Sequence, residues 1–164
     1  MKNIFYESWL AKTFLWDGYT SITLGCFVFT KQKEPKSPSD TGREFFSPVS
    51  KTHELTHVEQ WKELGIIGLI TSLILFFVTW NWFVFLIPIL MFYIVYLIEY
   101  LIKFIIKFIP NIGKLLSGKT NIGKINNDAY HNISLEIEAY NNQKNLNYPK
   151  ERKHFDWIKY MFKK

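Results

Sequence analysis

Cysteine is nearly absent from the 164-residue chain, and the pattern of a cleavable leader is missing as well. The single Cys26 excludes a disulfide within the chain, so we expect a buried thiol in a strand. Near the N-terminus, Glu7, Lys12 and Asp17 interrupt the aromatic residues, and no continuous apolar stretch leads to a small-residue cleavage site. We therefore expect no signal peptide. The length suits one domain over residues 1–164, not two independent ones.

Nucleic-acid-binding modules are also lacking, although the formal net charge is +6. The lysines gather beside an apolar block, from Lys103 to Lys124, and at the extreme C-terminus. Basic residues that flank an apolar span typically face anionic lipid on the cytoplasmic side of a membrane. We therefore expect a lipid bilayer as a partner and no nucleic acid.

Apolar residues are abundant, and they are concentrated in one block. Hydrophobic residues make up 48% of the chain and aromatic residues 18%, and the hydrophobic residues are densest between Ile66 and Ile109. This uneven distribution is typical of an integral membrane protein. As a helix, the block of roughly 44 residues would be about 66 Å long, near twice a hydrocarbon core of ~30 Å. One straight span is therefore too long.

The sequence Trp-Asn-Trp at 80–82 divides the apolar block, because tryptophan favours the membrane interface and asparagine can cap or turn a chain. We predict two helices, about Leu64–Thr79 and Phe83–Ile105, in a hairpin over 64–109 that either crosses the membrane or is re-entrant. Lysines at both ends of the hairpin predict that both flanks, and with them both termini, lie in the cytoplasm.

Two residues of the second apolar helix, Glu99 and Pro88, allow further predictions. Glu99 precedes Lys103 by four residues, and this spacing predicts an ion pair near the membrane interface. Pro88 is expected to kink the helix or to be tolerated by packing against the first one.

The remaining segments complete a fold that is mainly α with a small N-terminal β element. Residues 19–32 have the composition of a strand, with a kink or turn at Gly25. After Pro48 a helix is expected to begin near Ser50 or Thr52. The predicted segments are an N-terminal β and loop region (1–51), a motif helix (52–63), the hairpin (64–109), a turn-rich connector ending in a short helix (110–143), and a basic aromatic tail (144–164) that is either an interfacial helix or a solvated terminus.

The motif helix contains the sequence THELTHVEQW, with the pattern His-Glu-x-x-His at 53–57. Residues four apart share one helix face, so His53 and His57 can bind one metal ion, for which Zn²⁺ is the expected identity. Glu54 stands beside them, where its carboxylate can accept a proton from a water molecule activated by zinc. The pattern thus predicts a metal site with Glu54 as the general base.

A catalytic zinc site requires a third protein ligand. Glu63 is rejected, because on an unbroken helix it lies about 120° around the axis from His57. The better candidates are Glu136 and Glu138, which lie in the sequence SLEIEAY on a second short helix.

The two motifs together resemble the gluzincin pattern, in which His-Glu-x-x-His is completed by a glutamate within Glu-x-x-Ala-(Asp/Asn). Glu136 to Ala139 match that spacing with Glu136 as the ligand, and Tyr140 departs from it. Over residues 20–143, the order of SITLGCFVF, QWKELGIIGL and YHNISLEIEAYNN also resembles small bacterial membrane-associated proteins of zincin type.

The resemblance implies a membrane-anchored zinc metallopeptidase of the bacterial inner membrane, acting on peptide or protein substrates near the bilayer. Tyr130 and His131 precede the closing motif, and either could donate a hydrogen bond to a developing oxyanion, although ordinary packing also explains them. His154 is expected to be a surface residue. The alternative function is a non-catalytic membrane hairpin, as in a scaffold or a holin-like or toxin-like protein, with a structural metal or none.

Overall fold

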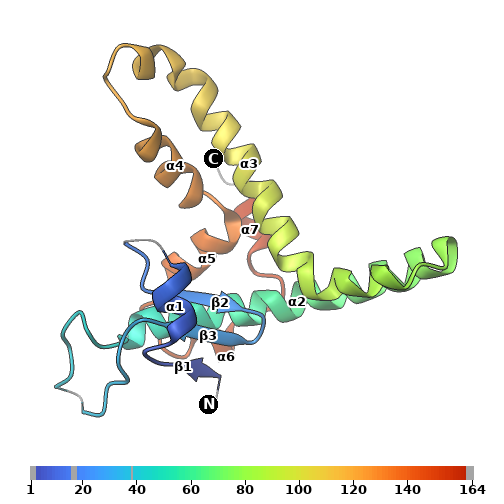
Figure 1. Ribbon diagram of the computed structural model, residues 1–164, viewed down its shortest axis with the longest axis horizontal. Coiled ribbons are helices and arrows are strands. Elements are labelled where there is room, and N and C mark those ends of the chain that lie inside the picture. Colours follow the sequence, from blue (N-terminus) through green and yellow to red (C-terminus); the bar gives the residue numbers. More distant parts are fainter. Residues whose placement is uncertain (1–2, 16–17, 38, 162–164) are drawn as a thin grey trace.

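The computed structural model describes residues 3–15, 18–37 and 39–161. The fold is mainly helical, with a small mixed sheet near the N-terminus, as the sequence predicted. Figure 1 shows the long helix α2 running across the lower half of the picture, with the sheet against its N-terminal half.

The sheet has three strands in the order β1-β3-β2, with β1 parallel and β2 antiparallel to β3. The predicted turn lies at Gly25, whose φ of +65° is left-handed and therefore favours glycine. Cys26 follows in this turn and is half-buried, so the prediction of a buried thiol in a strand is wrong. The elements of this region are β1 (Ile4–Phe5), α1 (Trp9–Phe14), β2 (Ser21–Leu24) and β3 (Phe27–Thr30).

Helix α2 (Pro48–Thr79) joins the predicted motif helix and the first apolar helix without a break. It begins two residues before Ser50, because the Ser47 side chain accepts a hydrogen bond from the Ser50 amide and Pro48 needs no partner in the first turn. One rigid helix therefore carries both the motif and half of the apolar hairpin.

The apolar hairpin turns where predicted. Trp80 ends α2 in the left-handed conformation, and the Asn81 side chain accepts a hydrogen bond from the Phe83 amide to start the 3₁₀ helix η1 (Trp82–Leu86). Helix α3 (Ile87–Leu116) then runs back along α2 before it climbs away (Figure 1). Among the described residues, α2 and the η1–α3 stretch are long and apolar enough to cross a membrane.

The prolines of α3 do not interrupt it. Pro88 lies in the first turn, where a missing N–H costs nothing, so no kink is needed there. The helix also continues through Pro110 to Leu116, well beyond its predicted end.

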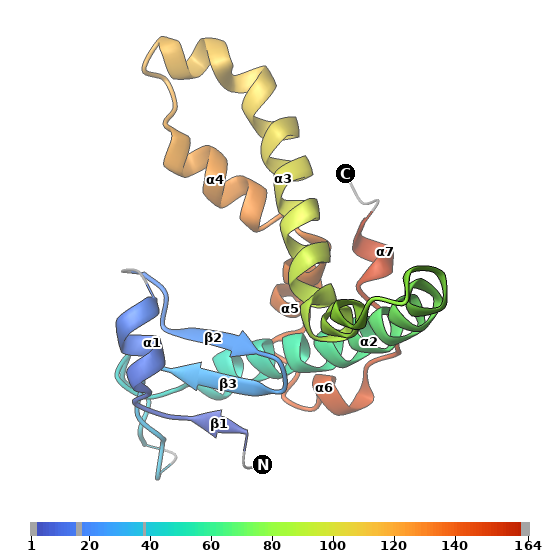
Figure 2. The same ribbon diagram turned by 45° about the vertical axis from the view of Figure 1, so that its right-hand side comes forward.

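The predicted connector is more helical than expected. Helix α4 (Ile122–Tyr130), capped by Asn121, returns beside α3 in both views (Figures 1 and 2), and α5 (Ser134–Asn142) follows it. Glu99 explains the start of α5: its buried carboxylate accepts hydrogen bonds from the amide and hydroxyl of Ser134, at 2.8 and 2.6 Å. The predicted Glu99–Lys103 ion pair is therefore wrong, because Glu99 caps the positive end of a helix instead.

The basic tail is neither an interfacial helix nor a frayed terminus over its described part. It forms the short helices α6 (Tyr148–Glu151) and α7 (Ile158–Met161), and Trp157 joins Leu64, Phe92 and Leu135 in the main hydrophobic core. Aromatic residues that sequence reasoning assigned to lipid or water thus pack inside the protein.

Candidate metal centre

His53, His57 and Glu136 meet at one point between α2 and α5, and all three are buried. The two Nε2 atoms lie 3.2 Å apart. Glu136 Oε2 lies 3.4 Å from Nε2 of His53, and its Oε1 lies 3.4 Å from Nε2 of His57. A tetrahedral ion with bonds of roughly 2.0–2.2 Å places neighbouring ligand atoms about 3.3–3.6 Å apart. The group can therefore hold a metal ion, as the sequence predicted.

The charge of this site also suits a cation. Burial by itself raises the pKa of the Glu136 carboxyl, but the imidazoles of His57 and His53 outweigh burial and hold that pKa well below its ordinary value. Oε2 of Glu136 is buried and has no hydrogen-bond partner among the described residues. A buried carboxylate oxygen without a hydrogen bond suits a cation, because a buried polar atom that is left unsatisfied is costly.

The other candidate glutamates lie elsewhere. Glu138, on the opposite side of α5, accepts hydrogen bonds from Gln60, Tyr148 and Arg152. Glu63 is bound by Arg152, which agrees with its rejection as a ligand. Of the two alternatives that the sequence left open, the structure brings Glu136 to the histidines.

Glu54 is held by strand β2. Its Oε1 accepts a hydrogen bond from the Ser21 hydroxyl at 2.7 Å, and its Oε2 accepts one from the Thr23 hydroxyl at 2.6 Å. Residues two apart on a strand point to the same face, so Ser-x-Thr in β2 places both hydroxyls toward α2. Sequence reasoning missed these two residues, although their alternation within the predicted strand segment 19–32 was a usable signal.

Tyrosines from α3, α4 and α5 surround the ligands. The Tyr96 hydroxyl donates to Oε1 of Glu136 at 2.8 Å. Tyr140, where the chain departs from the gluzincin pattern, places its ring 4.5 Å from the ring of His53. Tyr130 lines the cavity beside the ligands, while His131 is exposed and contacts the rings of Tyr130 and Tyr140. The hydrogen bond from Tyr130 or His131 to an oxyanion stays a prediction.

A cavity of about 510 Å³ adjoins the site and reaches His53, Glu54, His57 and Glu136. Its wall along α3 is mostly apolar and consists of Phe92, Tyr93, Tyr96, Leu97 and Tyr100. A second hollow of about 420 Å³ reaches His53 and Glu54 from the side of His131 and Tyr140. The ligands and Glu54 are thus accessible from open space although they are mostly buried.

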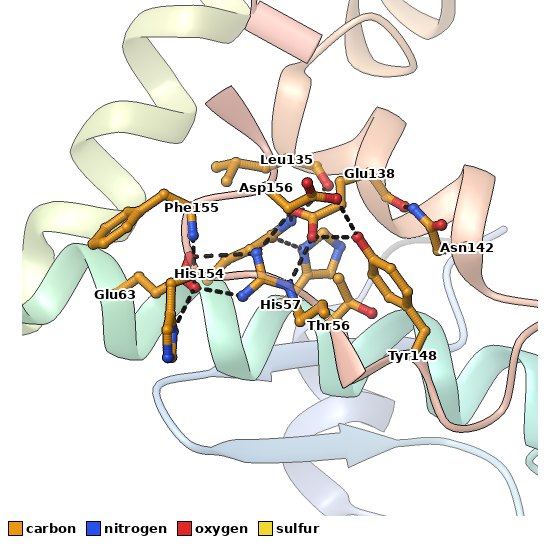
Figure 3. A network of polar contacts seen from close by, with 12 residues as sticks. Thr56, His57, Glu63, Leu135, Glu138, Asn142, Tyr148, His154, Phe155 and Asp156 are labelled. Atoms are coloured by element: carbon orange, nitrogen blue, oxygen red, sulfur yellow. Dashed lines mark hydrogen bonds and ion pairs between the residues drawn. The ribbon is translucent and has the colours of Figure 1, made fainter. Parts of the chain in front are cut away.

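A network of buried polar residues lies behind the site, and sequence reasoning missed it (Figure 3). Gln60 links His57 to Glu138, and Arg152 joins Glu138 to Glu63. Burial by itself lowers the pKa of Arg152, but Glu138 and Glu63 outweigh it and raise that pKa above its ordinary value, so the guanidinium stays charged. His154 is a surface residue, as predicted, with 90% of its side chain exposed.

Comparisons of the chain with protein-family models, with curated protein sequences and with solved structures found no match.

Proposed function

We propose that the protein is a membrane-anchored zinc metallopeptidase that hydrolyses peptide bonds at the cytoplasmic surface of the membrane. One observation carries the proposal: two histidines of a His-Glu-x-x-His helix and a glutamate from another helix converge at zinc-ligand distances, with Glu54 beside a cavity. The likeness of both motifs to gluzincins supports the same activity.

His53, His57 and Glu136 would hold the zinc ion, which supplies Lewis acidity for activating water and polarising a carbonyl group. Glu54 accepts the proton of the attacking water and passes it to the leaving amine. Ser21 and Thr23 orient its carboxylate. Burial, with the charge of Glu136, raises the pKa of Tyr130 above its ordinary value, so its hydroxyl stays protonated and able to donate to an oxyanion.

The cavity indicates which substrates suit the site. Its α3 wall offers aromatic and aliphatic side chains, so apolar substrate residues beside the cleaved bond would gain free energy by burial there. The other face of α3 is apolar and exposed, for instance at Ile94 and Ile98. A substrate that lies at the bilayer surface, such as an apolar protein tail, would therefore enter the cavity beside lipid.

The proposed anchor is the hairpin of α2 and α3 in a bacterial inner membrane, with both termini in the cytoplasm. The lysines on both flanks support this orientation. The metal ligands precede the apolar half of α2 on the same helix, so the anchor would fix the distance of the site from the bilayer.

The test compares the full chain in detergent with Glu54→Gln, by zinc analysis and by hydrolysis of casein and of a peptide library. The proposal expects one zinc per chain in both proteins and activity only in the wild type. Glu59→Gln makes the same change on the outer side of the helix, in a surface pair with Lys62, and should keep its activity. Hydrolysis that persists in Glu54→Gln would contradict the assigned mechanism.

One observation favours a second function, a non-catalytic membrane hairpin with a structural metal. Both carboxylate oxygens of Glu54 already accept hydrogen bonds from Ser21 and Thr23, as in a residue that ties α2 to the sheet. Bound zinc without hydrolysis of any library peptide would support this alternative.

A further inference from the structure

Gln60 occupies a position in which its side-chain amide has only one possible orientation. It is fully buried, and its Nε2 lies 3.0 Å from the Leu135 carbonyl oxygen and 2.9 Å from Glu138 Oε2. Both of these atoms are acceptors, so the NH₂ group of Gln60 must face them. Its Oε1 then faces Nδ1 of His57 at 2.7 Å.

This orientation determines where His57 carries its proton. An amide oxygen can only accept, so Nδ1 of His57 must donate to it. In the neutral imidazole the other nitrogen, Nε2, then has a free lone pair, and Nε2 is the atom that faces His53 and Glu136. A hydrogen bond of this kind on the outer nitrogen fixes the tautomer and the ring orientation of a metal-binding histidine.

Glu138, one of the two acceptors behind Gln60, is held in turn by the C-terminal segment 148–161. Glu138 is fully buried and accepts from Arg152 Nε at 2.7 Å and from the Tyr148 hydroxyl at 2.8 Å. Arg152 also donates to Glu63 Oε1 at 2.6 Å, and only 3% of its side chain is exposed. In Figure 3, Glu63, Glu138 and Tyr148 belong to one network of polar contacts and come from α2, α5 and α6.

The network therefore connects the two helices that supply the metal ligands. Gln60 and Glu63 belong to α2 with both histidines, while Glu138 lies two residues after Glu136 on α5. The guanidinium of Arg152 bridges the two carboxylates with a fork of N–H donors, which fixes geometry as well as charge. Moving Glu138 would move α5 and change the contact of Gln60 with His57.

We propose that Gln60 is a positioning residue for metal binding, and that Arg152 in the segment 148–161 holds it in place through Glu138. Gln60 keeps Nε2 of His57 free to bind the ion, and the C-terminal segment is a working part of the metal centre. The inference rests on the proposed zinc site and adds to it a requirement for residues far from the His-Glu-x-x-His motif.

Two variants of the full chain separate this role from simple packing. Gln60→Met has a similar volume but gives His57 no acceptor. The double variant Gln60→Glu with Glu138→Gln restores an acceptor for His57 and a donor between residues 60 and 138, with unchanged net charge. Neither variant can donate a hydrogen bond to the Leu135 carbonyl oxygen, so that loss is common to both. They differ in whether Nδ1 of His57 has an acceptor at residue 60. Asn141→Asp, an exposed amide-to-acid change on α5, is the matched control.

The measurements are the zinc dissociation constant in detergent, by competition with a chelating dye, the absorption spectrum of the cobalt(II) form, and the unfolding midpoint without metal. For Gln60→Met we expect the zinc dissociation constant to rise about 10- to 100-fold and the cobalt spectrum to change. This is the usual effect of removing the hydrogen-bond partner of a metal-binding histidine. The double variant should stay within about threefold of the wild type, and the control should be unchanged.

The outcomes distinguish this inference from the proposed function. Wild-type protein without zinc affinity would overturn both. Wild-type binding with an equal constant in Gln60→Met would overturn only the positioning role. If Gln60→Met does not fold, the double variant decides: a folded protein that binds zinc 10-fold or more weakly contradicts the inference, and near wild-type binding supports it.

Discussion

The two halves of α2 differ in which side chains they bury and which they expose. In the first half, up to Leu64, the buried side chains are mostly polar and include both histidines, Gln60 and Glu63. In the second half the buried residues are Gly68 and Ser72, while large apolar side chains such as Ile70 and Ile74 are exposed. One continuous helix therefore has a polar interior at one end and an apolar exterior at the other.

The two halves of α2 therefore suit different surroundings. The first half meets the sheet, α5 and the C-terminal segment, which provide hydrogen-bond partners for its buried polar groups. The second half has α3 as its neighbour on one side, and its apolar outer face has the character of a lipid-facing surface. The metal ligands lie in the half whose polar groups are satisfied by protein.

The largest effect is expected from removing a metal ligand from the polar half. His57→Ala should abolish stoichiometric zinc binding, because two remaining protein ligands do not make a stable site. Metal analysis of the purified full chain measures this. His154→Ala removes a histidine whose side chain is 90% exposed and should keep the zinc. Equal zinc content in His57→Ala would exclude the proposed site.

The second-largest effect is expected from removing the cation that pairs with the buried carboxylates beside the polar half of α2. Arg152→Met leaves the carboxylates of Glu63 and Glu138 buried without their cation. Removing one partner of a buried ion pair lowers the free energy of unfolding by about 3–5 kcal/mol. Denaturant unfolding measures this cost, with Lys150→Met, an exposed lysine of α6, as the control. Similar stabilities of the two variants would mean that the network does not support the fold.

A charge on the outer face tests the apolar half. The Ile74 side chain is 61% exposed, near the middle of the apolar part of α2. In a membrane, Ile74→Asp should cost about 3–4 kcal/mol of insertion free energy, since isoleucine favours and aspartate opposes insertion. The fraction of the protein in membranes, compared with Ile74→Leu, gives the result. If the aspartate leaves membrane association unchanged, the hairpin is not the anchor.

The smallest effect is expected where the two apolar helices touch. A Cβ atom at Gly68 would lie 2.7 Å from Pro88 Cα, but one at Gly65 would lie 3.5 Å from the Pro88 carbonyl oxygen, an ordinary contact. Gly68→Ala should therefore destabilise the hairpin by about 1–3 kcal/mol through overpacking. Gly65→Ala should be neutral or stabilising by up to about 1 kcal/mol, because alanine favours helix. Thermal unfolding in detergent compares the pair, and equal midpoints would contradict the close approach.

Much of the architecture could be predicted because it depends on local patterns. The helical spacing of His53 and His57, the strand composition around Gly25 and the turn at Asn81 each depend on neighbouring residues. The third ligand came from a motif resemblance, and the sequence left Glu136 and Glu138 open. The structure distinguishes them, because residues two apart on a helix point in different directions and their partners come from distant segments.

The failures have a shared cause. Glu99 was assigned to Lys103 because the two are close in sequence, but its partner is Ser134. The aromatic residues of the tail were assigned to lipid or solvent, but Trp157 belongs to the core. Sequence reasoning favours near neighbours, whereas a buried carboxylate or a large ring is satisfied by whichever segment folds onto it.

The sequence by itself determined that the chain has an apolar hairpin and a helix with two histidines on one face, because periodicity and composition act over short distances. The tertiary structure alone decided that Glu136 meets those histidines, that Ser21 and Thr23 hold Glu54, and that Arg152 lies behind the site. The contacts of Glu136, Ser21 and Thr23, and that of Arg152 with Glu63, join residues 31 to 89 positions apart. Only the packing of α2 between the sheet, α5 and the C-terminal segment brings them within bonding distance.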